Sequence, residues 1–193
     1  RRLRQMCIRD RTNASSPDRR RLNLPMSGHF DCIVIGAGAV GTAAAYHLAT
    51  RGHKVVALDP HPPGHDKGSS HGDTRIIRLV YFEHPDYVPL LKRAFTLWQE
   101  LDDRSETALF TQTGILQSGP REGKVIAGMR QAAETHGLMI EPLTATDVSN
   151  TYPGFHLRDG DEALFDPNGG ILAVEDCVRS HAEFATAAGA SIN

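Results

Sequence analysis

Apolar and polar residues follow two different periods along this chain. Residues 32–35 and 54–58 are short apolar runs rich in β-branched side chains, which are typical of buried strands. Between them, residues 42–50 favour a helix, and Gly52 is placed to end it. The order of strand, helix and strand predicts a βαβ unit.

Helical periodicity returns in later segments. Residues 86–101 place apolar side chains three and four positions apart with charged residues between them, and residues 122–136 and 175–188 favour helices as well. Thr144 followed by Asp147 indicates the cap of a further helix. The short strands that we expect are residues 109–111, 114–118, 138–141, 163–165, 170–172 and 190–193.

Two pairs of these strands are separated by only a few residues. We interpret residues 109–111 and 114–118 as a hairpin, and residues 166–169 (DPNG) as a turn between the two strands that flank it. The alternating elements indicate an α/β fold. In this fold a Rossmann-like βαβ unit is joined to part of a mixed sheet at about residues 80–170.

Three glycines between the first strand and the helix form the most informative motif. Gly36, Gly38 and Gly41 have the G-x-G-x-x-G spacing, and Asp59 ends the second strand about 20 residues later. The first glycine permits a tight turn, the second lets a pyrophosphate approach the backbone, and the third lets the helix pack closely. Glycines that serve packing alone are the alternative. The complete order of strand, glycines, helix and acid favours a nucleotide site.

This motif therefore predicts that the βαβ unit binds a dinucleotide. Asp59 is placed to accept hydrogen bonds from both ribose hydroxyls, which favours FAD or NAD over NADP. The residues that we expect to contact the cofactor here are Gly36, Ala37, Gly38, Ala39, Val40, Gly41, Asp59 and Pro60.

Residues 60–78 are rich in proline, glycine, serine and histidine and are expected to begin as a loop. The loop leaves the carboxyl end of the second strand, which is the ligand side of an open α/β sheet. Gly68, Ser69 and Ser70 are small enough to let backbone and hydroxyl groups meet a cofactor.

The basic side chains of this loop allow two interpretations each. His61, His65 and His71 suggest a metal site, but no cysteine accompanies them and no regular helix brings them together, so we expect no metal. Arg75 and Arg78 would share a face if the segment were helical, and would then bind an anion. A solvated or salt-bridged pair of arginines is the alternative.

Residues 1–25 differ from the rest of the chain. They carry eight arginines and two aspartates, so a formal charge of −2 for the whole chain leaves −8 on residues 26–193. A basic arm that binds nucleic acid and a transit peptide are alternatives, and the absence of an apolar core argues against a secretory signal. We expect residues 1–25 to be a disordered, non-native leader, because Met26 leads directly into the first strand.

The remaining composition indicates a protein that is neither membrane-bound nor disulfide-bonded. Hydrophobic residues make up 40% of the chain, and no apolar run approaches the roughly 18 residues of a membrane span. Cys7, Cys32 and Cys177 form no C-x-x-C pair, which indicates a reducing, cytoplasmic compartment. We expect no nucleic-acid partner.

Residues 68–78 (GSSHGDTRIIR) resemble the monomeric sarcosine oxidase and N-methyltryptophan oxidase family, flavoenzymes with the D-amino-acid-oxidase-like fold. The resemblance covers the chain from Phe30 to its end and includes YVPL at 87–90, LW at 97–98, FTQTGIL at 110–116, YPG at 152–154 and FDPNGGILA at 165–173. Departures from the family pattern occur at Ser70, Leu79 and Val80, which affects the identity of the substrate.

The resemblance implies an FAD-dependent oxidation of a secondary amino acid. In the family, a hydride equivalent passes from the carbon beside nitrogen to the flavin, the imine hydrolyses, and oxygen is reduced to hydrogen peroxide. Arg75 matches an arginine held against the flavin, Arg78 matches the arginine that binds the substrate carboxylate, and Tyr81 matches a residue near the substrate. The family match assigns flavin contacts to Gly68, Ser69, Ser70, Thr74, Arg75 and Ile76.

The resemblance also implies how the chain is divided. The expected segments are a leader at 1–25, an FAD-binding βαβ unit and flavin loop at 26–80, part of a substrate domain at 81–170, and a return to the FAD-binding domain at 171–193. The cysteine that attaches flavin in the family would then lie beyond residue 193, so Cys177 is not expected to carry flavin. The chain is expected to be the N-terminal half of a monomeric protein and inactive alone. An NAD-dependent dehydrogenase and a nucleotide-binding module without catalysis are the alternatives.

Overall fold

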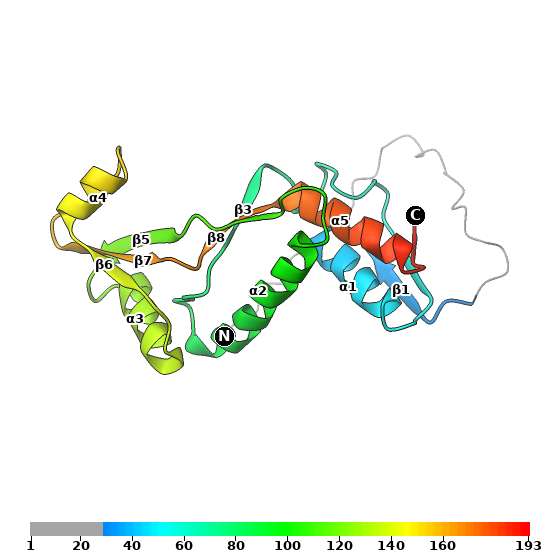
Figure 1. Cartoon of the computed structure of the whole chain (residues 1–193), viewed down its shortest axis with the longest axis horizontal. Helices are drawn as coiled ribbons and strands as arrows, with labels where there is room; N and C mark the ends of the chain where they lie inside the picture. The colour runs from blue at the N-terminus through cyan, green and yellow to red at the C-terminus, as the bar shows by residue number, and fades with distance from the viewer. Residues whose placement is uncertain (1–28) are drawn as a thin grey trace, which may run out of the picture.

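The computed structural model describes residues 29–193, so the leader predicted at residues 1–25 lies outside the described residues. The described part is elongated (Figure 1). One end holds the glycine motif and the helices α1 and α5, and the other end holds α3 and α4. Within residues 29–193 no helix combines the length and the apolar character that crossing a membrane requires.

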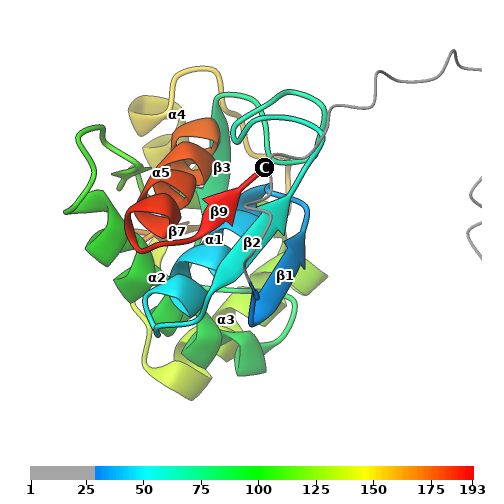
Figure 2. The ribbon, with the colours of Figure 1, turned by 90° about the vertical axis from the view of Figure 1, so that its right-hand side faces the viewer.

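A parallel sheet forms the end that contains the glycine motif. Its strands are β1 (Cys32–Ile35), β2 (Val55–Leu58) and β9 (Ser191–Ile192), in the order β1-β2-β9. Figure 2 shows this sheet with α1 (Ala39–Ala49) and α5 (Val174–Ala187) behind it. Small residues of the two helices pack with β2 into one buried cluster. The predicted βαβ unit and the α/β fold class are therefore confirmed, with α1 beginning at Ala39, inside the glycine motif.

A second sheet forms the middle of the molecule. In it β8 (Gly170–Ala173) pairs antiparallel with β3 (Thr74–Ile77) on one side and with β4 (Phe110–Thr111) on the other. The helix α2 (Val88–Asp102) follows the single 3-10 turn η1 (Pro85–Tyr87) and packs beside this sheet. Because residues 74–77 form a strand and not a helix, Arg75 and Arg78 do not share the helical face considered from the sequence.

A third sheet, in the order β5-β7-β6, forms the far end. It comprises β5 (Ile115–Pro120), β7 (Asp161–Asp166) and β6 (Glu141–Leu143), and α3 (Lys124–His136) packs against it. The strand predicted at 138–141 is therefore displaced towards the C-terminus. The short helix α4 (Ala145–Thr151) confirms Thr144 as its cap, because Thr144 and Asp147 bond each other's backbone in a capping box.

The predicted hairpin at 109–118 is wrong. β4 and β5 belong to different sheets, and β7 and β8 on either side of the 166–169 turn do as well. The two connections run side by side, since the Gly114 N–H donates to the Gly169 carbonyl at 2.9 Å. A Cβ added to Gly170 would lie 2.2 Å from the Thr111 carbonyl oxygen, so glycine permits this close crossing.

Asp166 lies at this crossing and is completely buried. One carboxylate oxygen accepts the backbone N–H groups of Leu79 and Val80 at 3.0 and 3.1 Å, and the other accepts that of Asn168 at 3.1 Å. A single side chain therefore attaches the segment after β3 to the turn between β7 and β8.

Cys177 lies on α5, is 2% exposed and packs on the core beside Leu109. Burial raises the pKa of its thiol to about 12, and the carboxylates of Asp176 and Asp102 add to the effect. Its Sγ donates weakly to the Leu109 carbonyl at 3.9 Å. A thiol in this environment is a poor nucleophile because it remains protonated.

Replacing Asp166 tests the crossing. Asp166→Ala leaves the Leu79 and Val80 N–H groups without their acceptor, so the free energy of unfolding should fall by about 3 kcal/mol or more. Urea denaturation measures this, with Asp159→Ala on an exposed loop as the control that should be nearly neutral. Equal midpoints for the two variants would contradict this role of Asp166.

Alkylation tests the state of Cys177. In the native chain at pH 8, iodoacetamide should leave Cys177 unmodified while it labels Cys32, which is only half-buried on β1. Both thiols should react once urea unfolds the chain. Peptide mass spectrometry reads the result, and rapid native labelling of Cys177 would show that its burial is wrong.

Candidate functional site

A cavity of about 170 Å³ lies beside the glycine motif, where the turn after β1, the end of β2, the following loop and α5 meet. Its lining residues are Gly38, Asp59, Gly64, His65, Gly68, Ser69, Ser70 and Val178. It therefore lies at the carboxyl ends of the parallel strands, which is where open α/β sheets bind ligands.

The three glycines have different roles at this cavity. Gly36 has a φ of +95°, which turns the chain sharply out of β1. A Cβ at Gly41 would lie 1.8 Å from the Gly36 carbonyl oxygen, so α1 packs against the turn only because this residue is glycine. A Cβ at Gly38 would meet only the side chain of Ser70, with Oγ at 3.5 Å, so space is open in front of this backbone.

The N-terminus of α1 faces this space, and its N-cap residue has no side chain that could accept the first N–H groups. Gly38 is the N-cap residue, and the first turn contains no acidic side chain. The Ala39 N–H donates to Ser70 Oγ at 3.3 Å, which connects the helix start to the following loop. Unpaired N–H groups and the positive end of the helix dipole favour a phosphate here.

Asp59 places a carboxylate at the end of β2, on the wall of the cavity. It accepts the backbone N–H groups of Ala37 at 2.7 Å and His61 at 2.9 Å, and His65 Nε2 lies 3.6 Å away. Burial raises the pKa of this carboxyl, but the two N–H donors and the neighbouring histidines outweigh burial and hold the pKa below its ordinary value. Asp59 is thus an ionised acceptor, as binding to ribose hydroxyls requires.

These observations fit the adenosine and pyrophosphate part of a dinucleotide. The open space at Gly38, the N-terminus of α1 and the ionised Asp59 are the features that this part of the cofactor needs. FAD and NAD share this part, so these residues alone do not separate the two.

Arg75 fastens the loop that borders the cavity. Its guanidinium donates to the carbonyl oxygens of Thr74 at 2.7 Å, Ser69 at 2.7 Å and His71 at 2.9 Å. The positive charge is therefore held beside residues 68–71. In the described part of the chain, no group of three or more His, Cys, Asp or Glu side chains is arranged to hold a metal ion.

Arg78 lies in a different environment just after β3. Its guanidinium carbon is 4.6 Å from the ring centres of both Tyr81 and Phe82, and Nη2 forms an ion pair with Glu83 at 2.6 Å. Nη1 also donates to Gln117 Oε1 at 3.2 Å. In this structure Arg78 is therefore salt-bridged within the chain, which is the alternative interpretation from the sequence, and aromatic faces hold its guanidinium in place.

The structure brings some of the predicted site residues together and separates others. Gly38, Asp59, Gly68, Ser69 and Ser70 meet at the cavity. Arg78 and Tyr81 form a second cluster that does not line it. The remaining predicted contacts are at the ends or flanks of the same elements, where Val40 and Ile76 are largely exposed.

Several residues of the two clusters were not predicted as site residues. His65 was considered only as a metal ligand, and Gly64 gave no signal beyond its place in the loop. Val178 comes from α5, more than a hundred residues away, so no local pattern would identify it. The pairing of Glu83 with Arg78 has one sequence signal, which is that an acidic residue follows the arginine by a few positions.

Comparison with known proteins shows which family and which folds this chain is similar to. A family model described as FAD dependent oxidoreductase (DAO) matches residues 31–192. NikD, an unusual amino acid oxidase essential for nikkomycin biosynthesis, has a solved structure with a TM-score of 0.73 and 31% identity, covering 85% of this chain and 42% of NikD. Glycine oxidase from Geobacillus kaustophilus has a similar fold, with a TM-score of 0.68 at 20% identity over 85% of this chain and 46% of that one.

Two curated relatives are more similar in sequence. Monomeric sarcosine oxidase of Bacillus sp. (strain B-0618) is 43% identical over 168 residues, or 86% of this chain and 43% of the oxidase. N-methyl-L-tryptophan oxidase of Citrobacter koseri is 38% identical over 160 residues, or 83% of this chain and 43% of that oxidase. The chain thus spans less than half the length of these relatives. The family match and these identities confirm the resemblance seen in the sequence, and the chain belongs to the DAO family of FAD-dependent oxidoreductases.

Proposed function

We propose that the complete protein oxidises the secondary amine of an N-methyl amino acid such as sarcosine, with FAD as cofactor and oxygen as electron acceptor. The amine loses two electrons and two protons to give an imine, which water hydrolyses to an aldehyde, and oxygen gains them as hydrogen peroxide. The observation that carries this proposal is the 43% identity to monomeric sarcosine oxidase over 168 residues. The family match favours FAD over the nicotinamide alternative.

We assign the cofactor to the cavity and its borders. Gly36, Gly38 and Gly41 shape the turn that would face the pyrophosphate, and Asp59 would hold the ribose. The other residues assigned to FAD are Ala37, Ala39, Val40, Pro60, Gly68, Ser69, Ser70, Thr74, Arg75 and Ile76. FAD supplies the two-electron chemistry when bound, and the protein supplies position and field.

We assign the substrate carboxylate to Arg78. A guanidinium binds two carboxylate oxygens in one plane, and the substrate carboxylate would take the place that Glu83 holds at 2.6 Å in this structure. Tyr81 provides one of the ring faces that keep this guanidinium in place and would lie near the substrate. Arg75 would favour negative charge beside residues 68–71, because its guanidinium is fixed there by three carbonyl groups.

The division of the chain follows from these assignments. We propose that residues 26–80 and 171–193 belong to the FAD-binding part and that residues 81–170 belong to the substrate part. The parallel sheet of β1, β2 and β9 supports the first, and the sheet of β5, β7 and β6 supports the second. We further propose a cytoplasmic, monomeric enzyme that uses a small amino acid and oxygen.

Gly38→Val tests the cofactor assignment. The backbone of Gly38 has a φ of −79°, which valine tolerates, but the new side chain would fill the space proposed for the pyrophosphate. FAD binding in the complete protein should weaken about tenfold or more, as measured by flavin absorbance after gel filtration and by fluorescence titration. Gly119→Val is the control, because a Cβ there meets nothing within 4 Å. Equal FAD affinity in both variants would refute the assignment.

Three variants at two arginines test the roles assigned to Arg78 and Arg75. Charge-assisted bonds to a carboxylate contribute roughly 1.5–3 kcal/mol, so Arg78→Ala in the complete enzyme should raise KM by about one to two orders of magnitude. Arg78→Lys should recover part of this, since lysine lacks the planar fork. Arg75→Ala should instead slow flavin reduction at saturating substrate in stopped-flow measurements. An unchanged KM for Arg78→Ala, or an unchanged reduction rate for Arg75→Ala, would contradict the corresponding role.

A further inference from the structure

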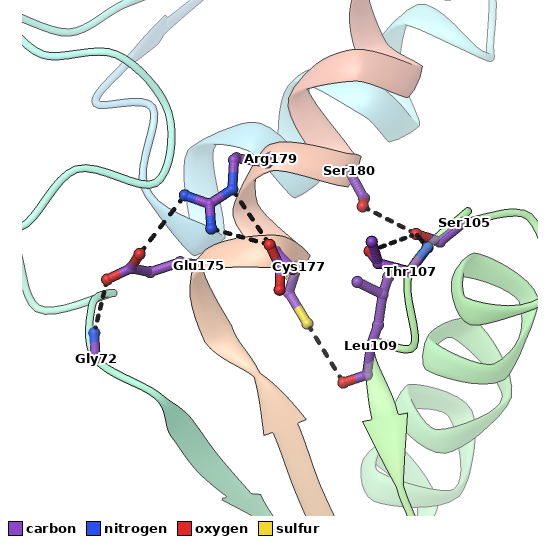
Figure 3. A network of polar contacts seen from close by, with 9 residues as sticks. Gly72, Ser105, Thr107, Leu109, Glu175, Cys177, Arg179 and Ser180 are labelled. Atoms are coloured by element: carbon purple, nitrogen blue, oxygen red, sulfur yellow. Dashed lines mark hydrogen bonds and ion pairs between the residues drawn. The ribbon is translucent and has the colours of Figure 1, made fainter.

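The first turns of α5 contact the loop that borders the cavity from a distant part of the chain. Glu175 Oε1 accepts the backbone N–H of Gly72 at 3.0 Å, and the two residues are 103 positions apart. Figure 3 shows Glu175 between Gly72 on one side and the guanidinium of Arg179 on the other. The second carboxylate oxygen of Glu175 is 3.5 Å from Arg179 Nη1.

Arg179 extends the contact to the other end of the same loop. A Cβ added to Gly64 would lie 2.7 Å from Arg179 Nη1 and 3.3 Å from the Glu175 carbonyl oxygen, so α5 lies directly against Gly64. The carboxylate of Asp176 also forms an ion pair with this guanidinium, with Oδ1 2.9 Å from Nη2. The pair Glu175 and Arg179 therefore contacts the loop at both Gly64 and Gly72.

Four of the eight residues that line the cavity lie between these two contacts. His65, Gly68, Ser69 and Ser70 all lie between Gly64 and Gly72 in the sequence and all face the cavity. Val178, which follows Glu175 by three positions on α5, lines the cavity as well. The position of α5 thus sets both a wall of the cavity and the ends of the loop opposite.

The ion pair alone would have little effect. Glu175 and Arg179 are partly exposed, at 33% and 45% of their side-chain surface, and exposed pairs contribute little to stability. The hydrogen bond from a backbone N–H to an ionised carboxylate is stronger and directional. This hydrogen bond restrains the loop and not the helix, because α5 is already fixed by its buried contacts with α1 and β2.

We propose that Glu175 and Arg179 are positioning residues that hold residues 64–72 in the conformation needed for FAD. This inference rests on the proposed function of the cavity. Neither residue lines the cavity, so their effect on affinity would pass through the loop. Arg179 orients Glu175, and Glu175 fixes Gly72.

Tryptic cleavage after Lys67 tests the loop without any cofactor. Lys67 is exposed and lies within the 64–72 segment. In the full chain without FAD, Glu175→Ala and Arg179→Ala should increase the cleavage rate at Lys67 about tenfold, since each loosens one contact. Glu175→Gln should recover most of the parental rate, because its amide oxygen still accepts the Gly72 N–H. Glu183→Ala, an exposed acid on the same helix, is the matched control.

FAD titration tests the consequence in the complete protein. Glu175→Ala should weaken FAD binding about tenfold, with recovery in Glu175→Gln. The unfolding midpoint of the apoprotein should match that of Glu183→Ala, which separates loop positioning from general destabilisation. Parental cleavage and parental FAD affinity in Glu175→Ala would overturn the inference, and so would a Glu175→Gln variant as impaired as Glu175→Ala. A parental protein that binds no FAD would instead overturn the proposed function, while the Lys67 cleavage rates would still decide whether Glu175 positions the loop.

Discussion

The position of the Arg78 and Tyr81 cluster relative to the sheets depends on one buried side chain, that of Asp166. A buried carboxyl group needs hydrogen-bond partners, and three backbone N–H groups supply them to Asp166. Two of the three belong to Leu79 and Val80, directly after Arg78. The same side chain therefore fixes both the β7–β8 turn and the segment that begins with Arg78 and contains Tyr81.

The strand β3 connects the loop that borders the cavity with the cluster of Arg78 and Tyr81. Arg75 lies within the strand and folds the preceding loop back with three hydrogen bonds to carbonyl groups, while Arg78 follows its last residue and enters a cluster of aromatic rings. Because Arg75 and Arg78 lie in and directly after an extended strand, they are not grouped on one face as they would be on a helix. The guanidinium of Arg75 therefore lies beside residues 68–71, and that of Arg78 lies beside Tyr81 and Phe82.

The cavity combines local and distant parts of the chain. The glycine turn, Asp59 and the loop are contiguous in sequence, and α5 closes the arrangement from residues 174–187. The helix is held by small residues packed between α1 and the parallel sheet, so it forms a rigid support for the more exposed loop. This explains why a cavity beside one βαβ unit still depends on a segment far along the chain.

The sequence alone determined the features that rest on local geometry. The βαβ unit, the roles of Gly36 and Gly41, the capping box at Thr144 and the family all followed from spacing and short motifs, because backbone preference and amphipathic period are encoded within one element. Only the tertiary structure decided which strands and side chains contact one another. It assigned β4 and β5 to different sheets, buried Asp166, and brought Glu175 to Gly72 across 103 positions. These outcomes depend on which surfaces are buried against each other over long distances, and no local window of sequence contains that information.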